Sequence, residues 1–513
     1  MEIKLPPRPG LTGILSATAA LNLLPLLGLS IYCLSKPEGA FRALGSEGIE
    51  QLGNTLLLLL LVGLGVGAFG SSIGWLTASC NFPGKKLLTI AQLIPLATPA
   101  YLEAAVLTDL GSREGLRLHG LGVAAAVLIL STLPYVVLLS RDSFRQSGRK
   151  HLEASRSLGL GAWASFRRVA LPMAIPAITS GVALAGMEVV NEFGAMELLG
   201  VPTLSTGILQ RWQGEGDPQG ATSLALIALA VVAVLVAAQR WQRRLSRRWD
   251  QGGPGDHFEG WQLRGPRAWL ATIFCLLPPL LSAGLPLAWI LRSSDQLRQE
   301  NLAELFGISA RSLVLGLAAA AMAVFMALAL AIGGRWLKVP WLKASIFMAG
   351  LGYAVPGAVL ALALLLLFAP LGLPPLLLLL YGYSNRFLAV AKGGLDANLE
   401  RLPPSIEEAA TSLGKNWQEV LRRVHLPILR SPLLLASMLV FVDTVKELPL
   451  TFALRPFNFD TLAVRVFQYA SDERLGAALA PALLIILLGL SSALLLAAEL
   501  KQEKIEPLPP LAS

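Results

Sequence analysis

The sequence predicts an all-α integral membrane protein of about twelve transmembrane helices, built as two parallel six-helix repeats. Of its 513 residues, 54% are hydrophobic and 15% are charged, which is more apolar surface than a soluble protein of this length can bury. The apolar residues form long runs; residues 52–76 carry no charge and can cross a ~30 Å hydrocarbon core. A polar segment also occurs twice, at 153–172 and 408–427, which indicates an internal duplication.

Twelve apolar stretches are predicted to span the membrane, and the basic residues predict their orientation. The predicted spans are 11–35, 52–76, 87–108, 120–140, 174–199, 221–239, 269–291, 311–333, 344–368, 373–391, 431–454 and 475–499. Lys and Arg concentrate in alternate loops, which is the positive-inside pattern and places the N- and C-termini in the cytoplasm. The net charge of +9 thus follows from membrane topology and predicts no nucleic-acid partner.

The cysteines and histidines indicate neither a disulfide framework nor a metal site. Cys33, Cys80 and Cys275 lie far apart in or beside apolar runs, where cysteine behaves as a small buried hydrophobic residue. The four histidines are scattered without the spacing of metal ligands. The sequence therefore assigns no metal site.

The two copies of the polar segment share ten identical residues in twenty gap-free positions, and each is predicted to form two short helices with a break. Gly159 and Gly414 lie at the break, because glycine lets the chain turn without a Cβ clash. Ser405 and Asn416, each followed three residues later by a glutamate, are typical of helix starts. Capping and turning alone would explain one such segment, but its recurrence with the same spacings favours a functional role.

The duplication extends beyond these loops. Glu192 pairs with Glu447, and Thr206 with Thr461, at the same separation as the two loops. Each half thus holds six spans of one orientation, and parallel repeats form a pseudo-two-fold pair about the membrane normal. The predicted domains are 1–51 (first span and external loop), 52–239 (first repeat), 240–268 (cytoplasmic linker), 269–310 (seventh span and external loop), 311–499 (second repeat) and 500–513 (cytoplasmic tail).

Two predicted spans carry matching polar side chains at membrane depth. These residues are Glu188, Asn191 and Glu192 in the fifth span and Asp443, Lys446 and Glu447 in the eleventh. Their i, i+3, i+4 spacing puts each trio on one helical face. Because an acid at the bilayer centre costs roughly 2.5–3.5 kcal/mol, the trios are expected to face the interior as a translocation path or gate. Alternatively, Lys446 neutralises Asp443 or Glu447 in a cluster that only orients helices.

The repeated segment resembles the EAA loop of type I ABC importer permeases, whose pattern is E-A-A-x-x-x-G followed by a stretch that ends in L-P. The second copy fits this pattern fully, and the first departs from it at Ser155. The resemblance covers nearly the whole chain and implies the type I permease fold. It also implies coupling contacts with two ATP-binding subunits on the cytoplasmic face through Glu153, Ala154, Gly159, Glu408, Ala409 and Gly414.

The nucleotide site is expected on those partner subunits. The sequence contains no G-x-x-x-x-G-K-[ST] motif. A G-x-G-x-x-G match at 65–70 lies inside an apolar run, where small residues allow close helix packing. ATP and Mg are therefore expected on the partner, no cofactor is expected in this chain, and the chain is not expected to be an enzyme.

Stretches in both halves resemble the fused permeases of ferric iron importers. They are 191–194, 200–203, 442–449, 454–463 and 470–474. The resemblance implies inward transport of ferric iron across a bacterial inner membrane, and an external or periplasmic substrate-binding protein that docks near 200–220 and 455–475. Ferric iron is a hard cation that suits an acidic path, but thiamine is also cationic, so a thiamine or other small-solute ABC importer is the alternative. A secondary transporter driven by an ion gradient is a further hypothesis.

Overall fold

A computed structural model describes residues 9–35, 45–146, 149–246, 260–293, 301–336, 352, 355–400 and 402–502. The regular secondary structure of this part of the chain is helical apart from one pair of two-residue parallel strands, β1 (Cys80–Asn81) and β2 (Trp261–Gln262). The all-α prediction is therefore confirmed. Part of the predicted linker, the first part of the predicted ninth span and most of the predicted C-terminal tail lie outside the described residues.

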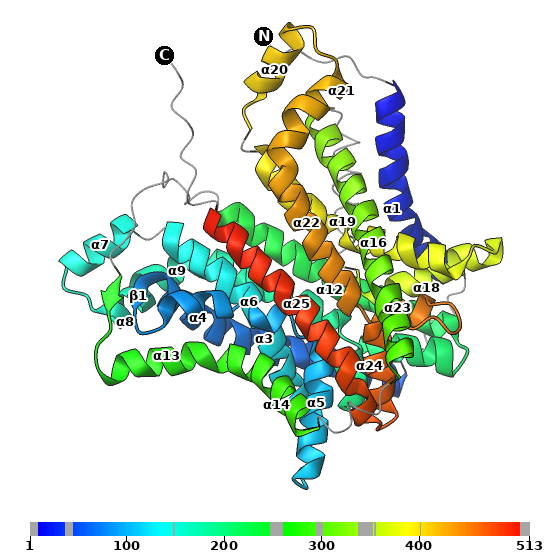
Figure 1. Cartoon of the computed structure of the whole chain (residues 1–513), viewed down its shortest axis with the longest axis horizontal. Coiled ribbons are helices and arrows are strands. Elements are labelled where there is room, and N and C mark those ends of the chain that lie inside the picture. Colours follow the sequence, from blue (N-terminus) through cyan, green and yellow to red (C-terminus); the bar gives the residue numbers. More distant parts are fainter. Residues whose placement is uncertain are drawn as a thin grey trace. The chain divides into compact units, whose positions relative to one another are not determined.

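The chain divides into two compact units, and each unit combines one repeat with helices from the other half of the sequence (Figure 1). The first-repeat unit contains Phe41–Glu300 and Arg465–Ser513, and the second-repeat unit contains Met1–Ala40 and Asn301–Val464. The predicted first span thus belongs with the second repeat, while the seventh and twelfth spans belong with the first. The sequence repeats and the spatial units therefore differ in composition.

The first-repeat unit is built from long helices joined by short ones. Its helices are α3 (Ser46–Ser79), α4 (Lys85–Ala91), the 3-10 turn η1 (Ile94–Leu96), α5 (Ala100–Arg113), α6 (Leu121–Gln146), α7 (Arg149–Ser157), α8 (Ala162–Ser165), the π-helical turn η2 (Phe166–Ala170), α9 (Leu171–Asn191), α10 (Gly194–Leu198), α11 (Leu204–Leu209), the π-helical turn η3 (Gln210–Gly214), α12 (Pro218–Ser246), α13 (Pro266–Pro279), the π-helical turn η4 (Leu280–Gly284), α14 (Leu285–Arg292) and α25 (Leu475–Gln502).

The second-repeat unit follows the same order of long and short helices. Its helices are α1 (Pro9–Ser35), α16 (Leu302–Trp336), α18 (Gly357–Phe368), the 3-10 turn η6 (Ala369–Leu371), α19 (Pro375–Glu400), α20 (Pro404–Ser412), α21 (Trp417–Val420), the π-helical turn η7 (Leu421–His425), α22 (Leu426–Lys446) and α23 (Pro449–Leu454). Helix α24 (Leu462–Ser471) begins in this unit and ends in the other.

Among the described residues, eight helices are long and apolar enough to cross a membrane, and one bent pair makes a possible ninth span. Two further apolar helices, Gly357–Leu371 and Leu475–Ser491, are shorter. Each of the twelve predicted spans coincides at least in part with a helix. The helical architecture thus agrees with the multi-span prediction, although the described helices of several spans are shorter than predicted.

The third predicted span is bent instead of straight. Its two parts, Lys85–Leu96 and Ala100–Arg113, meet at an angle of 91°. Pro95 and Pro99 lie at this bend, and a proline removes a backbone donor and clashes with the preceding helical turn. The prediction of a continuous span at 87–108 was therefore wrong in geometry.

Hydrogen bonds fix the helices that each unit takes from the other half of the sequence. In the first-repeat unit, the Gln92 side-chain amide donates to the carbonyl of Cys275 in α13, at 2.6 Å. In the second-repeat unit, the Asn385 amide donates to the carbonyl of Asn22 in α1, at 3.0 Å. Both amides are buried, so each bond satisfies polar groups that the apolar surroundings cannot.

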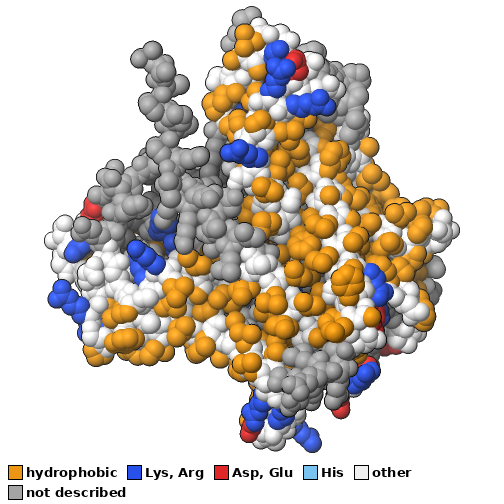
Figure 2. Space-filling model, viewed as in Figure 1, with side chains coloured by type: hydrophobic (Ala, Val, Ile, Leu, Met, Phe, Trp, Pro, Cys, Tyr) orange, Lys and Arg blue, Asp and Glu red, His pale blue; other side chains and the backbone are white. Residues whose placement is uncertain are grey.

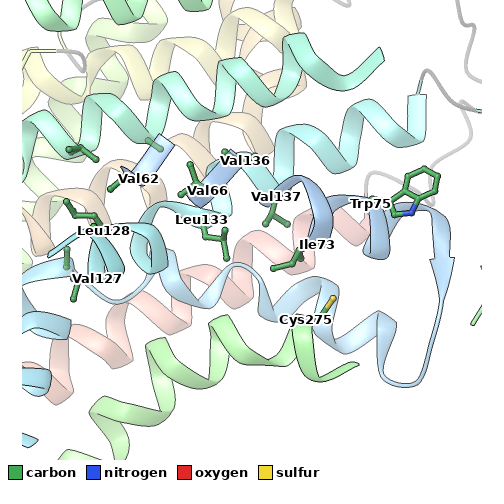
Figure 3. Packing of buried hydrophobic residues seen from close by; sticks show 14 of the residues in the cluster. Val62, Val66, Ile73, Trp75, Val127, Leu128, Leu133, Val136, Val137 and Cys275 are labelled. Atoms are coloured by element: carbon green, nitrogen blue, oxygen red, sulfur yellow. The ribbon is translucent and has the colours of Figure 1, made fainter. Parts of the chain in front are cut away.

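The core of the first-repeat unit lies between α3 and α6 (Figure 3). Its labelled members include Val62, Val66 and Ile73 of α3 and Leu133, Val136 and Val137 of α6. Glycines allow this approach, because a Cβ on Gly65 would lie 2.4 Å from Ile129 Cδ1, and a Cβ on Gly70 would lie 2.7 Å from Val136 Cβ. The segment 65–70 thus packs helices, as its apolar setting indicates.

The outward faces of the long helices are apolar. Figure 2 shows hydrophobic side chains over α13 and α22, and Lys and Arg side chains near helix ends. Leu434 of α22 and Ile273 of α13 are 64% and 58% exposed. In a soluble protein such surface would be unfavourable, whereas in a bilayer it is the surface that lipid covers.

Candidate functional site

The two copies of the repeated segment fold in the same way. We refer to 149–170 as loop 1 and to 404–425 as loop 2. Loop 1 runs through α7, a left-handed Gly159 (φ 79°), α8 and η2 into α9; loop 2 runs through α20, a left-handed Gly414 (φ 76°), α21 and η7 into α22. The prediction of two helices with a break at glycine is confirmed in both copies.

The hydrogen bonds at each break are also repeated. The Leu160 N–H donates to the Ser155 carbonyl at 3.0 Å, and the Lys415 N–H donates to the Ala410 carbonyl at 3.2 Å. Such a bond, from the residue after a left-handed glycine back to the last helical turn, defines the Schellman motif. The glycine therefore ends α7 and α20 in a defined direction.

Both helices of loop 2 are predicted to start at a capping box, α20 at Ser405 and α21 at Asn416. The Glu419 N–H donates to Asn416 Oδ1 at 2.9 Å, and the Asn416 N–H donates to Glu419 Oε2 at 3.3 Å, so the box before α21 is confirmed. The one predicted from Ser405 is wrong, because α20 already begins at Pro404. Proline suits the first helical position, where its missing N–H costs nothing.

The residues predicted to face partner subunits are exposed in both loops. They are Glu153, Ala154 and Gly159 in loop 1 and Glu408, Ala409 and Gly414 in loop 2. Sequence reasoning missed Leu158 and Leu413, the equivalent residues just before each glycine, which are 81% and 78% exposed. Their signal was available, since both are apolar and identical in an otherwise polar segment. Each loop thus presents the same small apolar and acidic surface.

Loop 2 is held to its helices by a charged cluster. Arg335 at the end of α16 places Nε 2.5 Å from Glu407 Oε1, and donates through Nη1 and Nη2 to the carbonyls of Leu399 and Leu402 at 2.6 and 2.8 Å. The fully buried His425 lies with Nε2 3.1 Å from the same Glu407 oxygen. These contacts tie α20 to the helices on either side.

Loop 1 is held differently. Ser155 Oγ and Ser165 Oγ are 2.9 Å apart and buried, so the one departure from the E-A-A pattern gains a hydrogen bond across the break. An aromatic cluster of Trp75, Phe166 and Trp261 lies beside it, with ring centroids 5.4 Å apart for each pair with Trp75. Trp261 lies in β2, so part of the predicted linker packs on Trp75, the residue of α3 that also contacts Phe166 of loop 1.

Glu192 and Glu447 act as carboxylate caps of short helices. Each follows the last residue of a long helix with nearly the same extended backbone (φ −70°, ψ 122° and φ −68°, ψ 125°). Glu192 Oε1 accepts from the Ala195 N–H at 2.9 Å, and Glu447 Oε1 accepts from the Leu450 N–H at 3.0 Å. The N–H groups of Glu192 and Glu447 still donate to the carbonyls of Glu188 and Thr444 in the last turn of each helix, at 2.9 and 3.2 Å. The shared helical face of each trio therefore stays a prediction.

The remaining members of the trios stay within α9 and α22. Glu188 and Asn191 are half-buried. Asp443 and Lys446 form an ion pair with Oδ1 and Nζ 2.8 Å apart, and their side chains are 20% and 23% exposed. Lys446 thus neutralises Asp443, which is one of the two pairings that the sequence left open.

Several buried polar residues in the spans were missed. Arg386 of α19 is 4% exposed and donates to the Val355 carbonyl at 3.3 Å. Glu103 of α5 is also 4% exposed and accepts from Ser282 Oγ of η4 at 2.8 Å. Their charge within apolar runs was visible in the sequence, but their partners lie far away along the chain.

Within the described ranges, no group of three or more His, Cys, Asp and Glu side chains could hold a metal ion. The three cysteines all lie within the described residues and form no disulfide, and Cys80 and Cys275 are buried. Burial raises the pKa of Cys80 to about 11, so its thiol stays protonated at neutral pH.

Known proteins resemble this chain in sequence. A family model described as binding-protein-dependent transport system inner membrane component matches residues 70–251, which include loop 1 and Glu192. The Fe(3+)-transport system permease protein FbpB 2 of Haemophilus influenzae is 26% identical over 449 residues, which cover 85% of this chain and 87% of that protein. A match of this length extends through both repeats.

Two relatives match about a third of this chain. The molybdenum transport system permease protein ModB of Escherichia coli is 30% identical over 200 residues, which cover 35% of this chain and 86% of ModB. The sulfate transport system permease protein CysT of Escherichia coli is 28% identical over 212 residues, which cover 38% of this chain and 76% of CysT. The chain therefore belongs to the family of binding-protein-dependent transport system inner membrane components, as a fused type I ABC importer permease.

Proposed function

We propose that this permease moves ferric iron inward, driven by two separate ATP-binding subunits that dock on loop 1 and loop 2. The observation that carries the proposal is the matched geometry of the two loops, each with a left-handed glycine and the same exposed residues before it. Two equal docking surfaces suit two copies of one ATPase. The similarity to the iron permease of Haemophilus influenzae through both repeats supports the choice of cargo.

The proposed orientation places both loops and both termini in the cytoplasm of a bacterium. The Lys and Arg bias between alternate loops supports it. In loop 1, Arg167 and Arg168 are exposed beside the docking surface, and in loop 2 Arg422 and Arg423 are. ATP and Mg then belong to the partner subunits, and this chain needs no cofactor of its own.

The loops are suited to transmit movement. Residues after each glycine continue without a sharp bend into a span, so that Ala162–Asn191 and Gln418–Lys446 are helices of 30 and 29 residues. The contact of Arg335 with Glu407 holds α20, and that of Ser155 with Ser165 holds α7, so the helix before each glycine is also fixed in place. A displacement imposed on either loop by ATP-driven closure therefore moves a whole span as a rigid body.

The polar residues near the other ends of these spans are the proposed translocation path or gate. We assign Glu188, Asn191, Asp443 and Lys446 to its lining, because they are half-buried within apolar helices. Glu192 and Glu447 shape the break where each span ends. Among them, the side-chain oxygens of Glu188, Asn191 and Asp443 are hard ligands, which suit Fe³⁺ better than thiols do.

A deletion strain that expresses this chain with its ATPase and binding protein is expected to take up radiolabelled Fe³⁺, and the strain without the chain is not. Labelled thiamine, molybdate and sulfate are measured in parallel, because cationic thiamine fits the same acids and the other two are solutes of relatives. Uptake of one of these solutes without uptake of iron would replace the proposed cargo and leave the coupling mechanism intact.

Charge reversal of both loop glutamates, Glu153→Lys with Glu408→Lys, is expected to lower uptake at least tenfold. Both side chains are exposed, so the change removes an acidic contact with the ATPase at little expense of folding. Immunoblots of membranes check the amount of chain, and the double reversal of nearby exposed Arg168 and Arg423 to Glu serves as the control for non-specific charge effects. Wild-type uptake in the glutamate variant would contradict docking at these residues.

A further inference from the structure

One connection is three residues longer in the second repeat than in the first. Glu192 and Glu447, which are 255 positions apart, occupy the same place after α9 and α22. Thr203 and Thr461, which are 258 positions apart, each directly precede the next equivalent helix, α11 or α24. The second repeat therefore has three extra residues between these two points.

Hydrogen bonds establish the second equivalence independently. The N–H of Leu204, the first residue of α11, donates to Thr55 Oγ1 at 3.0 Å. The N–H of Leu462, the first residue of α24, donates to Ser312 Oγ at 2.8 Å. The structure thus makes Thr203 the counterpart of Thr461, and the predicted match of Thr461 with Thr206 was wrong.

The added length falls in a closed turn of six residues, which we call the 455–460 turn. Arg455 and Asp460 form an ion pair across its base. Inside it, the Phe459 N–H donates to the Pro456 carbonyl at 3.1 Å, and Asn458 has a left-handed backbone (φ 59°). Asparagine is among the few residues that tolerate this conformation.

Arg311 of α16 fastens the turn to the rest of the second-repeat unit. Its Nη1 donates to the Asn458 carbonyl at 2.9 Å, and its guanidinium lies 5.7 Å from the ring centroid of Phe459. A turn held at its base and at its tip keeps a fixed shape. Less conformational entropy is therefore lost when another molecule binds to it.

This turn presents Phe457, which is 95% exposed. The shorter connection of the first repeat has no such side chain; Gly200 there is left-handed and Val201 is 4% exposed. Aromatic residues that bury their surface against a partner dominate the energy of many interfaces. An exposed phenylalanine on the rigid 455–460 turn is therefore suited to bind another molecule.

The position of the turn indicates which molecule that is. Within the second-repeat unit, α20 and α21 lie at one end of α22, and α23, which leads into the 455–460 turn, lies at the other (Figure 1). If loop 2 faces the cytoplasm, as the proposed function holds, the 455–460 turn faces the side from which solute arrives. On that side a binding-protein-dependent permease meets its binding protein.

The presence of the turn in one repeat alone points to the same partner. A solute-binding protein is a single chain without the pseudo-two-fold symmetry of the repeats, so it must distinguish one repeat from the other in order to dock in one direction. We propose that Phe457 is the anchor by which the external solute-binding protein docks on the second repeat and recognises it. This inference rests on the orientation in the proposed function.

The test uses the full chain with its ATPase in nanodiscs and the Fe³⁺-loaded binding protein as the probe. Phe457→Ala is expected to raise the Kd of that protein about tenfold or more, with unchanged ATPase activity in its absence. Leu116→Ala, which shortens a 58% exposed side chain in the first repeat, is the matched control and is expected to change the Kd less than twofold. An unchanged Kd for Phe457→Ala overturns the proposal.

A second pair of variants tests the rigid 455–460 turn instead of the Phe457 side chain. Asn458→Gly retains the left-handed backbone and is expected to bind like the wild type, whereas Asn458→Val, which disfavours it, is expected to weaken binding as Phe457→Ala does. Equal binding by both variants would contradict the role of the rigid turn. Quenching of a Phe457→Trp variant by brominated lipids would assign the side chain to the membrane and overturn the proposal.

A wrong cargo assignment is separated from a wrong anchor by running thiamine- and molybdate-loaded binding proteins in the same assay. If one of these stimulates the wild-type ATPase and the iron protein does not, the cargo is corrected and the effect of Phe457→Ala is measured with that protein. If none of the three stimulates the wild type, the docking proposal fails with them.

Discussion

Replacing Gly159 and Gly414 together with valine is expected to abolish uptake while the chain still inserts into the membrane. Both glycines have positive φ, 79° and 76°. An L-residue in this conformation costs about 1–2 kcal/mol, and a β-branched residue is strained further. Because the strain is relieved by unwinding the Schellman turns, α7 and α20 would lose their fixed direction, and we expect uptake to fall at least tenfold.

Gly161 provides the matched control for this experiment. It lies two residues after Gly159, and a Cβ built on any of the three glycines meets no atom within 4 Å. Gly161 differs in having φ −72°, which any L-residue adopts. Gly161→Val is therefore expected to retain most of the uptake, measured with immunoblots and with the ATPase activity of the complex. Equal loss in Gly161→Val and in the double variant would show that bulk, not backbone direction, is what matters.

The loops could be predicted because their signals are local. A glycine before a second helix start requires no knowledge of the rest of the fold, and Asn416 with Glu419 forms a cap within four residues. The repeat added a second, independent copy of the same signals. The exposed Leu158 and Leu413 could have been found in the same way, since an identical apolar residue in two polar loops needs a reason.

The composition of the two units could not be predicted from these patterns. A helix that is apolar on all sides gives no indication of which face meets lipid and which meets protein. Helix α1 has this character, and its place beside the second repeat depends on single polar contacts such as that between Asn385 and the Asn22 carbonyl. The cluster of Arg335, Glu407 and His425 likewise joins residues far apart in sequence.

The breaks after α9 and α22 were only partly visible. In the second repeat, Leu448 precedes Pro449, and a residue before proline disfavours the helical conformation, so the end of α22 could have been predicted. The first repeat has no proline there, and Phe193 is followed by Gly194. The sequence therefore indicates only a helical position for Glu192, whereas its carboxylate accepts from the Ala195 N–H of the next helix.

Replacing Glu447 with alanine is expected to destabilise the chain more than Glu192→Ala does. Glu447 is 5% exposed and accepts from the Leu450 and Thr451 N–H groups, both at 3.0 Å, and from Thr451 Oγ1 at 2.8 Å. Each buried donor left without an acceptor costs about 1–3 kcal/mol, so the loss is several times that of a single hydrogen bond. Glu192 is half-buried, so water can replace its carboxylate.

Thermal denaturation of the purified variants in detergent measures this order, and similar midpoints for the two alanine variants would contradict it. Glu447→Gln separates the cap from the charge, because glutamine keeps one side-chain oxygen as an acceptor and removes the negative charge. If Glu447 serves mainly as a cap, this variant should be more stable than Glu447→Ala and should transport nearly as well as the wild type. If it is stable but loses uptake, the charge itself meets the solute, and Glu447 belongs to the translocation path as well as to the break.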